Sequence, residues 1–482
     1  MIKRLTTGFT ALLMMLSLVT PASLPSPVSG PGTLPSLPLT DILKAVTIAR
    51  QTPATLVTAN SFDYYADSVT GLTDESYTTD EINRLLKDYG VFEGPAGMPV
   101  EEYKEAMEQE WTDATVYNKK VQKIAINITK SYTYSKIVSF LKILSHRDGV
   151  YLFDIGSTTA GRRMYALEVD IPSDKDKQTV VLTGSIHARE TAGTTFLLKE
   201  ITDLLQADTD ESREVLENIR FAIVVCVNPD GREGVAFDTA NYTYRGGTLW
   251  KATSNGTDLN RNFPGLSWSM IRNGYKKAKS ISTSSDKIFY PGDYGGSCNE
   301  TKAMMKFLYH YIVLEHATAI IDYHQQGRIA YAGKAWLTDD HHNRCIELAN
   351  TMFKTMNPGN SRKYYVEEDN KESGQDGEGS TLTDFALSVA LGAKFSPGYG
   401  CFVFTDGKKE YPLIAINRLE TTDKKVLENA NFITQISFEI GLGTKMLGYS
   451  KETRKLLSGE YVDYHFDRVL YTLNDFLKSH TY

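Results

Sequence analysis

The feature that most constrains this chain is an apolar, β-branched run that ends at a histidine. Residues 180–186 read as a buried strand, His187 follows it, and Glu190 opens residues 191–205, whose apolar positions recur at helical spacing. His187 and Glu190 therefore lie where a strand passes into a helix. An imidazole and a carboxylate so spaced can both reach one zinc ion, and catalytic zinc sites add a third protein ligand. A lone His-x-x-Glu is common by chance, so the assignment depends on residues further along the chain.

The composition is that of a folded protein with a large core. Of 482 residues, 41% are hydrophobic and 23% charged, and the net charge of −7 is spread without a basic stripe, which argues against a nucleic-acid partner. Residues 1–25 have the basic, apolar and small-residue regions of a secretory signal peptide. No other apolar run approaches about 18 residues, so we expect a protein without a membrane anchor. The expected location is outside the cell, either free or associated with the cell wall.

The remaining chain divides by pattern into two parts. Residues 26–122 are acidic and partly helical, and we interpret them as an accessory region or an inhibitory pro-region. Residues 123–482 alternate strand-like and helix-like segments, which predicts an α/β fold with a mixed, largely parallel twisted sheet flanked by helices. A long irregular stretch, residues 228–298, interrupts them, and such stretches usually carry function.

The four cysteines are too few and too scattered for a disulfide framework. Cys226 lies in an apolar strand-like run and is expected to be a buried thiol. One bridge among Cys298, Cys345 and Cys401 is left open, with three possible pairings.

A second apolar run also ends at a histidine. Residues 318–323 read as a buried strand and His324 follows directly. Active-site groups of open α/β sheets gather at the carboxyl ends of strands, so His324 is the expected third metal ligand. His341 and His342 are in an acidic, turn-like context and are weaker candidates.

Five motifs in one order make a family resemblance visible. They are His187-Ala188-Arg189-Glu190, Val227-Asn228-Pro229-Asp230-Gly231, Asp258-Leu259-Asn260-Arg261-Asn262-Phe263, Glu300-Thr301 and Asp322-Tyr323-His324. Their order and spacing resemble those of the zinc metallocarboxypeptidases of the carboxypeptidase A and carboxypeptidase T type, from about residue 132 onward. Residues 250–264 and 323–327 look most similar to the bacterial branch that includes γ-D-glutamyl-diamino-acid peptidases.

The resemblance implies a metal site. His187, Glu190 and His324 would hold one Zn²⁺, and Asp258 matches the family aspartate that hydrogen-bonds a zinc-bound histidine. Such a carboxylate fixes the tautomer of the imidazole and raises its basicity.

The resemblance also implies substrate contacts. Asn260 and Arg261 match the pair that grips the terminal carboxylate, a task that suits a planar guanidinium beside an amide. Lys251 stands where many relatives have the arginine that stabilises the oxyanion. Thr383 aligns with the floor of the pocket for the terminal side chain, where a neutral hydroxyl offers no charge for Lys or Arg.

The general base is where this chain departs most from the family pattern. An ungapped match places Gly400 near the family glutamate, whereas Glu439, in an apolar run ending Glu-Ile-Gly, resembles the family strand if residues 397–431 are an insertion. We prefer Glu439, with Glu410 and Glu420 inside the insertion as alternatives. Relatives of the carboxypeptidase A type also carry a tyrosine in the loop before residues 379–380. Residues 374–377 stand in that neighbourhood here, and no tyrosine matches.

Together these interpretations predict a secreted, monomeric zinc metallocarboxypeptidase that removes C-terminal residues from peptides. Two alternatives stay open. The substrate could be a γ-D-glutamyl-diaminopimelate stem peptide of peptidoglycan, or the chain could be a non-catalytic peptide- or wall-binding relative that has lost its base.

Overall fold

The structure is a computed structural model, and it describes residues 93–94, 98–99, 123–237, 250–268, 285, 289–333, 339–359, 363–368, 381–396, 398–405, 410–411, 433–441 and 451–480. Of the N-terminal 122 residues it describes only β1 (Glu93–Gly94) and β2 (Met98–Pro99), which pair antiparallel. The predicted signal peptide and the predicted helical accessory region otherwise lie outside the described residues.

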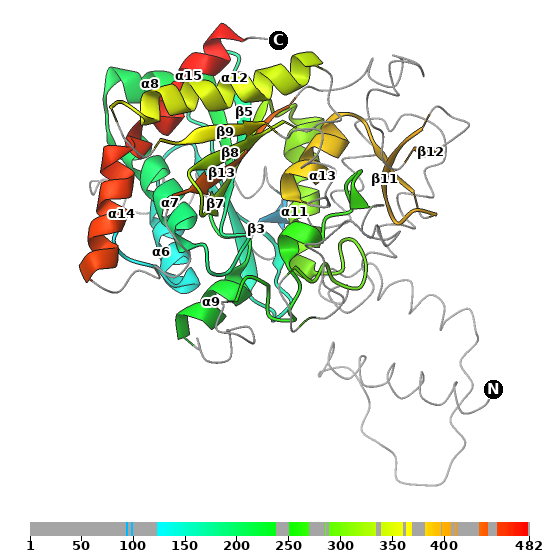
Figure 1. The fold of residues 1–482 in the computed structure, drawn as a ribbon. Helices are drawn as coiled ribbons and strands as arrows, with labels where there is room; N and C mark the ends of the chain where they lie inside the picture. The colour runs from blue at the N-terminus through cyan, green and yellow to red at the C-terminus, as the bar shows by residue number, and fades with distance from the viewer. Residues whose placement is uncertain are drawn as a thin grey trace, which may run out of the picture. The chain divides into compact units, whose positions relative to one another are not determined.

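An eight-stranded mixed sheet forms the centre of the described chain (Figure 1). Its strand order is β3-β4-β6-β5-β7-β13-β8-β9, and four of its seven described pairings are parallel. In chain order the strands are β3 (Val150–Ser157), β4 (Arg163–Val169), β5 (Gln178–Gly184), β6 (Ile219–Val224), β7 (Ala319–Gln325), β8 (Ile329–Ala332), β9 (Tyr365–Glu368) and β13 (Thr434–Ile440). This architecture confirms the predicted α/β fold with a mixed, largely parallel sheet.

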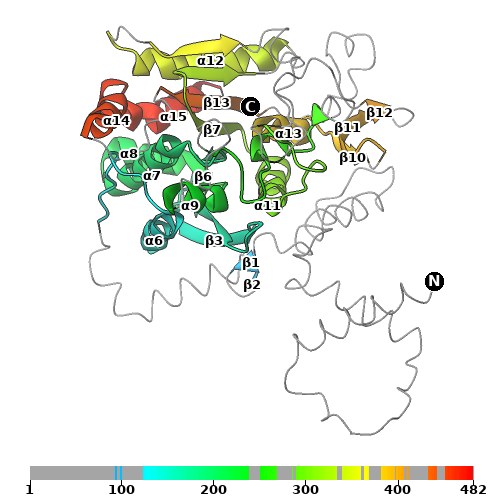
Figure 2. The same ribbon diagram turned by 60° about the horizontal axis from the view of Figure 1, so that its bottom comes forward.

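Helices cover both faces of this sheet (Figure 2). One face carries α7, α8, α12, α14 and α15, the other carries α11 and α13, and α6 packs against β3 and α9. Their bounds are α6 (Tyr134–Leu144), α7 (Thr191–Gln206), α8 (Asp210–Asn218), α9 (Pro229–Phe237), α11 (Asn299–Tyr309), α12 (Asp339–Met356), α13 (Leu382–Ala390), α14 (Lys451–Asp463) and α15 (Val469–Ser479). None of the helices in the described ranges is long and apolar enough to cross a membrane.

The alternation of side chains along β7 separates the core from the site. Tyr323 points to the face that α7 covers, where its hydroxyl donates to Glu200 and its ring packs against Phe438 of β13. Since side chains alternate along a strand, Asp322 and His324 lie on the opposite face. One face of the central strands is therefore an aromatic core, and the other presents polar groups.

Two features differ from the expected elements. The stretch 228–298, expected to be irregular, contains helix α9 and a short 3₁₀ turn, Leu259–Arg261. The insertion expected at 397–431 includes part of a small antiparallel sheet of β10 (Lys394–Ser396), β11 (Cys401–Thr405) and β12 (Glu410–Tyr411).

All four cysteines are buried free thiols. This confirms the prediction for Cys226, and it shows none of the three bridges left open among the others.

Candidate metal centre

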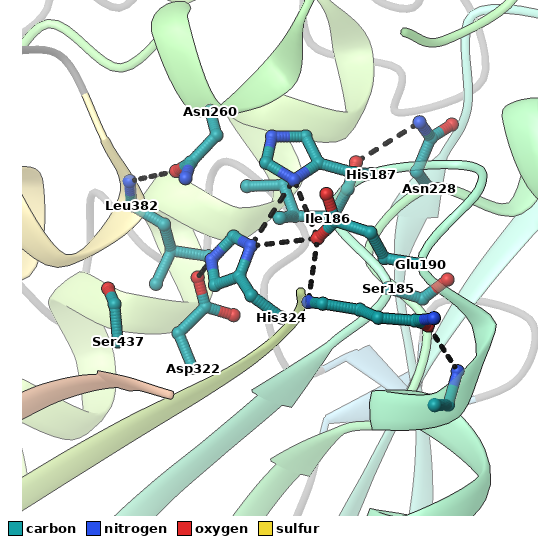
Figure 3. Close-up of polar contacts among 12 residues, drawn as sticks. Ser185, Ile186, His187, Glu190, Asn228, Asn260, Asp322, His324, Leu382 and Ser437 are labelled. Carbon is teal, nitrogen blue, oxygen red and sulfur yellow. Dashed lines mark hydrogen bonds and ion pairs between the residues drawn. The ribbon is translucent and has the colours of Figure 1, made fainter. Parts of the chain in front are cut away.

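Three side chains from two segments, the connection between β5 and α7 and the end of β7, meet at the carboxyl ends of β5 and β7 (Figure 3). The Oε2 atom of Glu190 lies 2.9 Å from Nδ1 of His187 and 3.1 Å from Nδ1 of His324. The two Nδ1 atoms are 3.2 Å apart, and all three residues are buried. We call these three residues the ligand triad.

The ligand triad fits a zinc ion by donor type and by spacing. Two imidazole nitrogens and one carboxylate oxygen are a common donor set for zinc, with bonds of about 2.0–2.1 Å. A tetrahedron with such bonds has edges of about 3.3–3.4 Å. The observed separations of 2.9–3.2 Å are only slightly shorter, so outward shifts of a few tenths of an ångström would admit the ion.

His187 is held by the loop that follows β5 and by a second loop that crosses it. Asn228 donates from its backbone nitrogen to the Ser185 carbonyl and from its side chain to the Ile186 carbonyl. Its Oδ1 accepts from the backbone nitrogen of Gly231, where an added Cβ would lie 2.4 Å from the Ala252 carbonyl oxygen. The Asn-Pro-Asp-Gly segment therefore clamps the loop that carries His187.

Glu190 stands at the start of α7, directly over β7. Its Oε2 accepts from the backbone nitrogen of Gln325, and the Gln325 side chain accepts from the backbone nitrogen of Ala192. Burial alone would raise the pKa of Glu190, but the His187 and His324 imidazoles hold it well below its usual range. The carboxylate is therefore ionised and available as a ligand.

Each histidine of the ligand triad has a carboxylate at its other ring nitrogen. Nε2 of His187 lies 3.2 Å from Oδ1 of Asp258, and Nε2 of His324 lies 2.7 Å from Oδ2 of Asp322. Burial opposes ionisation of Asp258, yet His187 and the Lys251 ammonium hold its pKa below its usual range. Burial also opposes protonation of His324, and the Asp322 carboxylate raises its pKa well above its usual value.

Glu439 lies beside the ligand triad, because β13 pairs in parallel with β7 and places Glu439 opposite His324. Its Oε2 atom is buried and has no hydrogen-bond partner among the described residues. Burial, reinforced by the charge of Glu190, raises the pKa of Glu439 above that of an ordinary carboxyl.

The alternatives to Glu439 lie elsewhere or outside the described ranges. Gly400 lies in the turn before β11, and Glu410 begins β12 of the small sheet, where it accepts a hydrogen bond from Ser396. Glu420 lies outside the described residues. His341 is on α12, with its Nε2 against the Ile433 carbonyl, and does not join the ligand triad.

Asn260 and Arg261 form the 3₁₀ turn that Asp258 caps through the backbone nitrogen of Asn260. Oδ1 of Asn260 accepts from the Leu382 backbone nitrogen, which leaves its amide nitrogen as a donor. Nη1 of Arg261 donates to the Asn260 carbonyl, and its buried Nε has no partner among the described residues. Lys251 lies in the loop that precedes this turn, and its carbonyl oxygen accepts a hydrogen bond from the backbone nitrogen of Ala188.

Thr383 is buried in the first turn of α13. Its hydroxyl lies 3.4 Å from the hydroxyl of Ser437, which is on β13 two residues before Glu439 and so on the same face. The neighbouring Asp384 accepts from Ser267 at 2.5 Å. One hydroxyl on the strand of the expected base and one beside it thus lie near Glu439.

The expectations from sequence did not include roles for Asp322 and Asn228. Asp322 precedes His324 by two residues on one strand, so the two-residue period of a strand places both side chains on one face. Asn228 was part of a recognised motif, but its two contacts to the loop of His187 depend on tertiary structure.

Comparison with known proteins supports the same kind of site. A family described as zinc carboxypeptidase matches residues 137–389, more than half of the 482 residues. Carboxypeptidase Z of Gallus gallus is 28% identical over 189 residues, which are 37% of this chain and 28% of that protein. Carboxypeptidase B2 of Bos taurus is 25% identical over 248 residues, 48% of this chain and 54% of that protein. The matches therefore span between about a quarter and about half of these relatives.

The fold also has a counterpart among solved structures. Bovine thrombin-activatable fibrinolysis inhibitor, solved in complex with tick carboxypeptidase inhibitor, aligns with a TM-score of 0.51 at 19% identity. The alignment covers 73% of this chain and 99% of that one, and it supports the fold.

Proposed function

This chain belongs to the zinc carboxypeptidase family, and from that premise we propose that it is a secreted metallocarboxypeptidase that removes residues from the free carboxyl end of peptides. The observation that carries the proposal is the placement of Glu439, whose Oε2 atom is buried, opposite the expected metal ligand His324 on a neighbouring strand. Export rests on the pattern of residues 1–25 alone.

Zinc is the family's cofactor, and His187, Glu190 and His324 would hold it. When bound, it polarises a carbonyl group and lowers the pKa of an adjacent water. Asp258 and Asp322 would keep the two imidazoles in the orientation that directs their Nδ1 atoms at the ion.

Glu439 is the proposed general base. Its unpartnered Oε2 can accept a proton from the attacking water and return it to the leaving amine. Because the Oε2 atom is buried and Glu439 lies opposite His324 on the neighbouring strand, the proton would be held beside the ligand triad.

Arg261 and Asn260 are the proposed carboxylate anchor. The buried Nε of Arg261 and the amide nitrogen of Asn260 are donors available for a carboxylate of the substrate. Holding the chain end there would leave only its last peptide bond in line with Glu439. Lys251 would balance the charge that develops on the carbonyl oxygen, as a point charge.

The terminal side chain is proposed to meet the hydroxyls of Thr383 and Ser437. Neither hydroxyl offers a charge to Lys or Arg, so an uncharged terminal residue is the expected preference.

The test is mass spectrometry of peptides incubated with the purified, zinc-loaded chain. Three substrates are compared: a free-ended peptide mixture, its C-terminally amidated copies and a γ-D-glutamyl-diaminopimelate stem peptide. We expect trimming of free ends only. Glu439→Gln should lower kcat by at least about 10³-fold while the bound zinc stays stoichiometric.

The other outcomes would change the proposal. Cleavage of the stem peptide alone would assign the protein to cell-wall turnover. No cleavage with zinc still bound would favour a binding relative and reject Glu439 as base, and wild-type turnover by Glu439→Gln would reject it as well.

A further inference from the structure

An aromatic ring lies against both cations of the proposed active site. The Lys251 ammonium is 4.9 Å from the centroid of the Phe289 ring, and the Arg261 guanidinium carbon is 5.3 Å from it. Both distances are within the roughly 6 Å at which a ring attracts a cation.

We propose that Phe289 is a positioning residue, which holds Lys251 and Arg261 beside the ligand triad so that both meet a substrate carrying a free carboxylate. The inference rests on the proposed function, because it assigns these two cations to the carbonyl and the carboxylate of a peptide end.

A ring suits this position better than a carboxylate would. Two like charges near one point repel each other, and a group that attracts both offsets that repulsion. A carboxylate would do so by cancelling the positive charge that the substrate has to meet. The ring attracts the cations through its quadrupole and leaves their charge and their donors available, including the unpartnered Nε of Arg261.

The structure fixes Phe289 relative to the turn of Arg261. The backbone nitrogen of Asp258 donates to the Tyr290 carbonyl at 2.7 Å, directly after Phe289. On the other side of Arg261, the Asn262 side chain donates to the Pro291 carbonyl at 2.7 Å. The ring and the guanidinium therefore belong to two segments that are hydrogen-bonded to each other on both sides of Arg261.

The backbone of Phe289 is unusual. Its φ is +67°, in the left-handed region that bulky residues rarely adopt. The surrounding bonds hold the residue there, and such conformations gather at functional sites.

The experiment separates the π-system from apolar volume. Phe289→Leu keeps a large apolar side chain without a ring, and Phe289→Tyr keeps the ring. The zinc-loaded full chain is assayed on peptides with free C-termini. We expect Phe289→Leu to lower kcat/KM about tenfold, mainly through KM, and Phe289→Tyr to stay within about twofold of wild type.

Phe140→Leu is the matched control. Lys136 lies 4.7 Å from the Phe140 ring, on α6, which packs against β3 at the edge of the sheet. This variant also removes a ring under a lysine, and it should leave KM and kcat unchanged. Melting temperatures of all variants are compared, so that a loss of folded protein is recognised.

Binding separates failure of this inference from failure of the proposed reaction. A peptide analogue with a reduced last bond is titrated by calorimetry, in free-carboxylate and amidated forms. If only Phe289→Leu loses the preference for the carboxylate, the inference stands even when no peptide is cleaved. Any of three results would overturn the inference. The first is wild-type binding and KM in Phe289→Leu, and the second is an equal loss in Phe289→Tyr or Phe140→Leu. The third is the absence of a carboxylate preference in the wild-type protein.

Discussion

At the residue scale, two carboxylates stand behind the two imidazoles of the ligand triad. Asp258 and Asp322 come from different segments, a loop and strand β7, yet both meet the Nε2 atom of a histidine whose Nδ1 faces the site. Asp322 is itself fixed by the hydroxyl of Thr183 on β5 at 2.7 Å. Both rings are therefore oriented before a metal arrives.

We expect Asp322→Asn to weaken zinc binding about 10- to 100-fold, because an amide neither fixes the tautomer of His324 nor raises its basicity as a carboxylate does. Competition with a fluorescent chelator would give the dissociation constant. Asp258→Asn should cause a loss of similar size at His187.

Asp154→Asn provides the control for this substitution. Asp154 is also a buried aspartate, but it pairs with Arg163 at the sheet edge. This variant should bind zinc as wild type does. Unchanged zinc affinity in Asp322→Asn would contradict a role for the Asp322 carboxylate in metal binding.

The residues of the triad were predictable because each follows a recognisable local pattern. His187 follows apolar strand β5, His324 is the second-last residue of apolar strand β7, and Glu190 is the N-cap of helix α7. Asp322 could have been found by the same reasoning, from its two-residue spacing to His324. The two cations on Phe289 could not, since no local pattern relates a ring at position 289 to charges at 251 and 261.

At the scale of elements, the contact between α7 and β7 sets the position of Glu190. Gly193 lies in the first turn of α7, and a Cβ there would be 2.9 Å from the Tyr323 carbonyl oxygen and 3.1 Å from its carbon. These are backbone atoms of a central strand and cannot move aside. Only glycine lets the helix approach close enough for Glu190 to reach His324.

Gly193→Ala should therefore destabilise the fold by about 1–3 kcal/mol. In an exposed helix the same change would stabilise by about 0.5–1 kcal/mol, so the sign of the effect is diagnostic of the clash. Urea unfolding would measure it.

Gly398→Ala tests whether the effect is local. A Cβ at Gly398 would have an ordinary contact of 3.7 Å with the Ser396 hydroxyl, so we expect a change within about 0.5 kcal/mol. Equal stability of Gly193→Ala and wild type would show that α7 can shift away from β7.

The sequence predicted individual helices and strands better than it predicted which strands pair in the sheet. Helix α7 was apparent from the helical spacing of the apolar positions in residues 191–205, and in the structure it ends one residue later, at Gln206. The pairing of β13 with β7 was not apparent, because sheet neighbours far apart in sequence leave no local pattern. For the same reason, residue spacing alone could not choose between Gly400 and Glu439.

At the scale of the whole molecule, a buried histidine couples stability to pH. His341 on α12 lies against the Ile433 carbonyl at the start of β13, and burial lowers its pKa to about 4. The unfolded chain protonates near the ordinary value of about 6.5. The neutral ring therefore contributes stability above about pH 6.5 that is lost as the pH falls toward 4.

Between pH 6.5 and 4, this loss should lower the free energy of unfolding by up to about 3 kcal/mol. The His341→Gln variant should lack this dependence on pH. Chemical unfolding at several pH values between 7 and 4 is the measurement, and the gap between wild type and variant should narrow as the pH falls. His146→Gln, a substitution at an exposed histidine, should keep the wild-type slope. A constant gap for His341→Gln would contradict the prediction.

Strand β13 also determines when a complete site can exist. Apart from β9, β8 pairs only with β13 in the described sheet, so without β13 the sheet would be two separate pieces, β3-β4-β6-β5-β7 and β8-β9. The strand that joins them is the last of the sheet to be synthesised, and it carries Glu439. A nascent chain could thus gather its metal ligands early, but the proposed base arrives only when the sheet closes. Closure of the sheet and acquisition of hydrolytic capacity would then be one event, which would protect the unfinished polypeptide and its surroundings from premature cleavage.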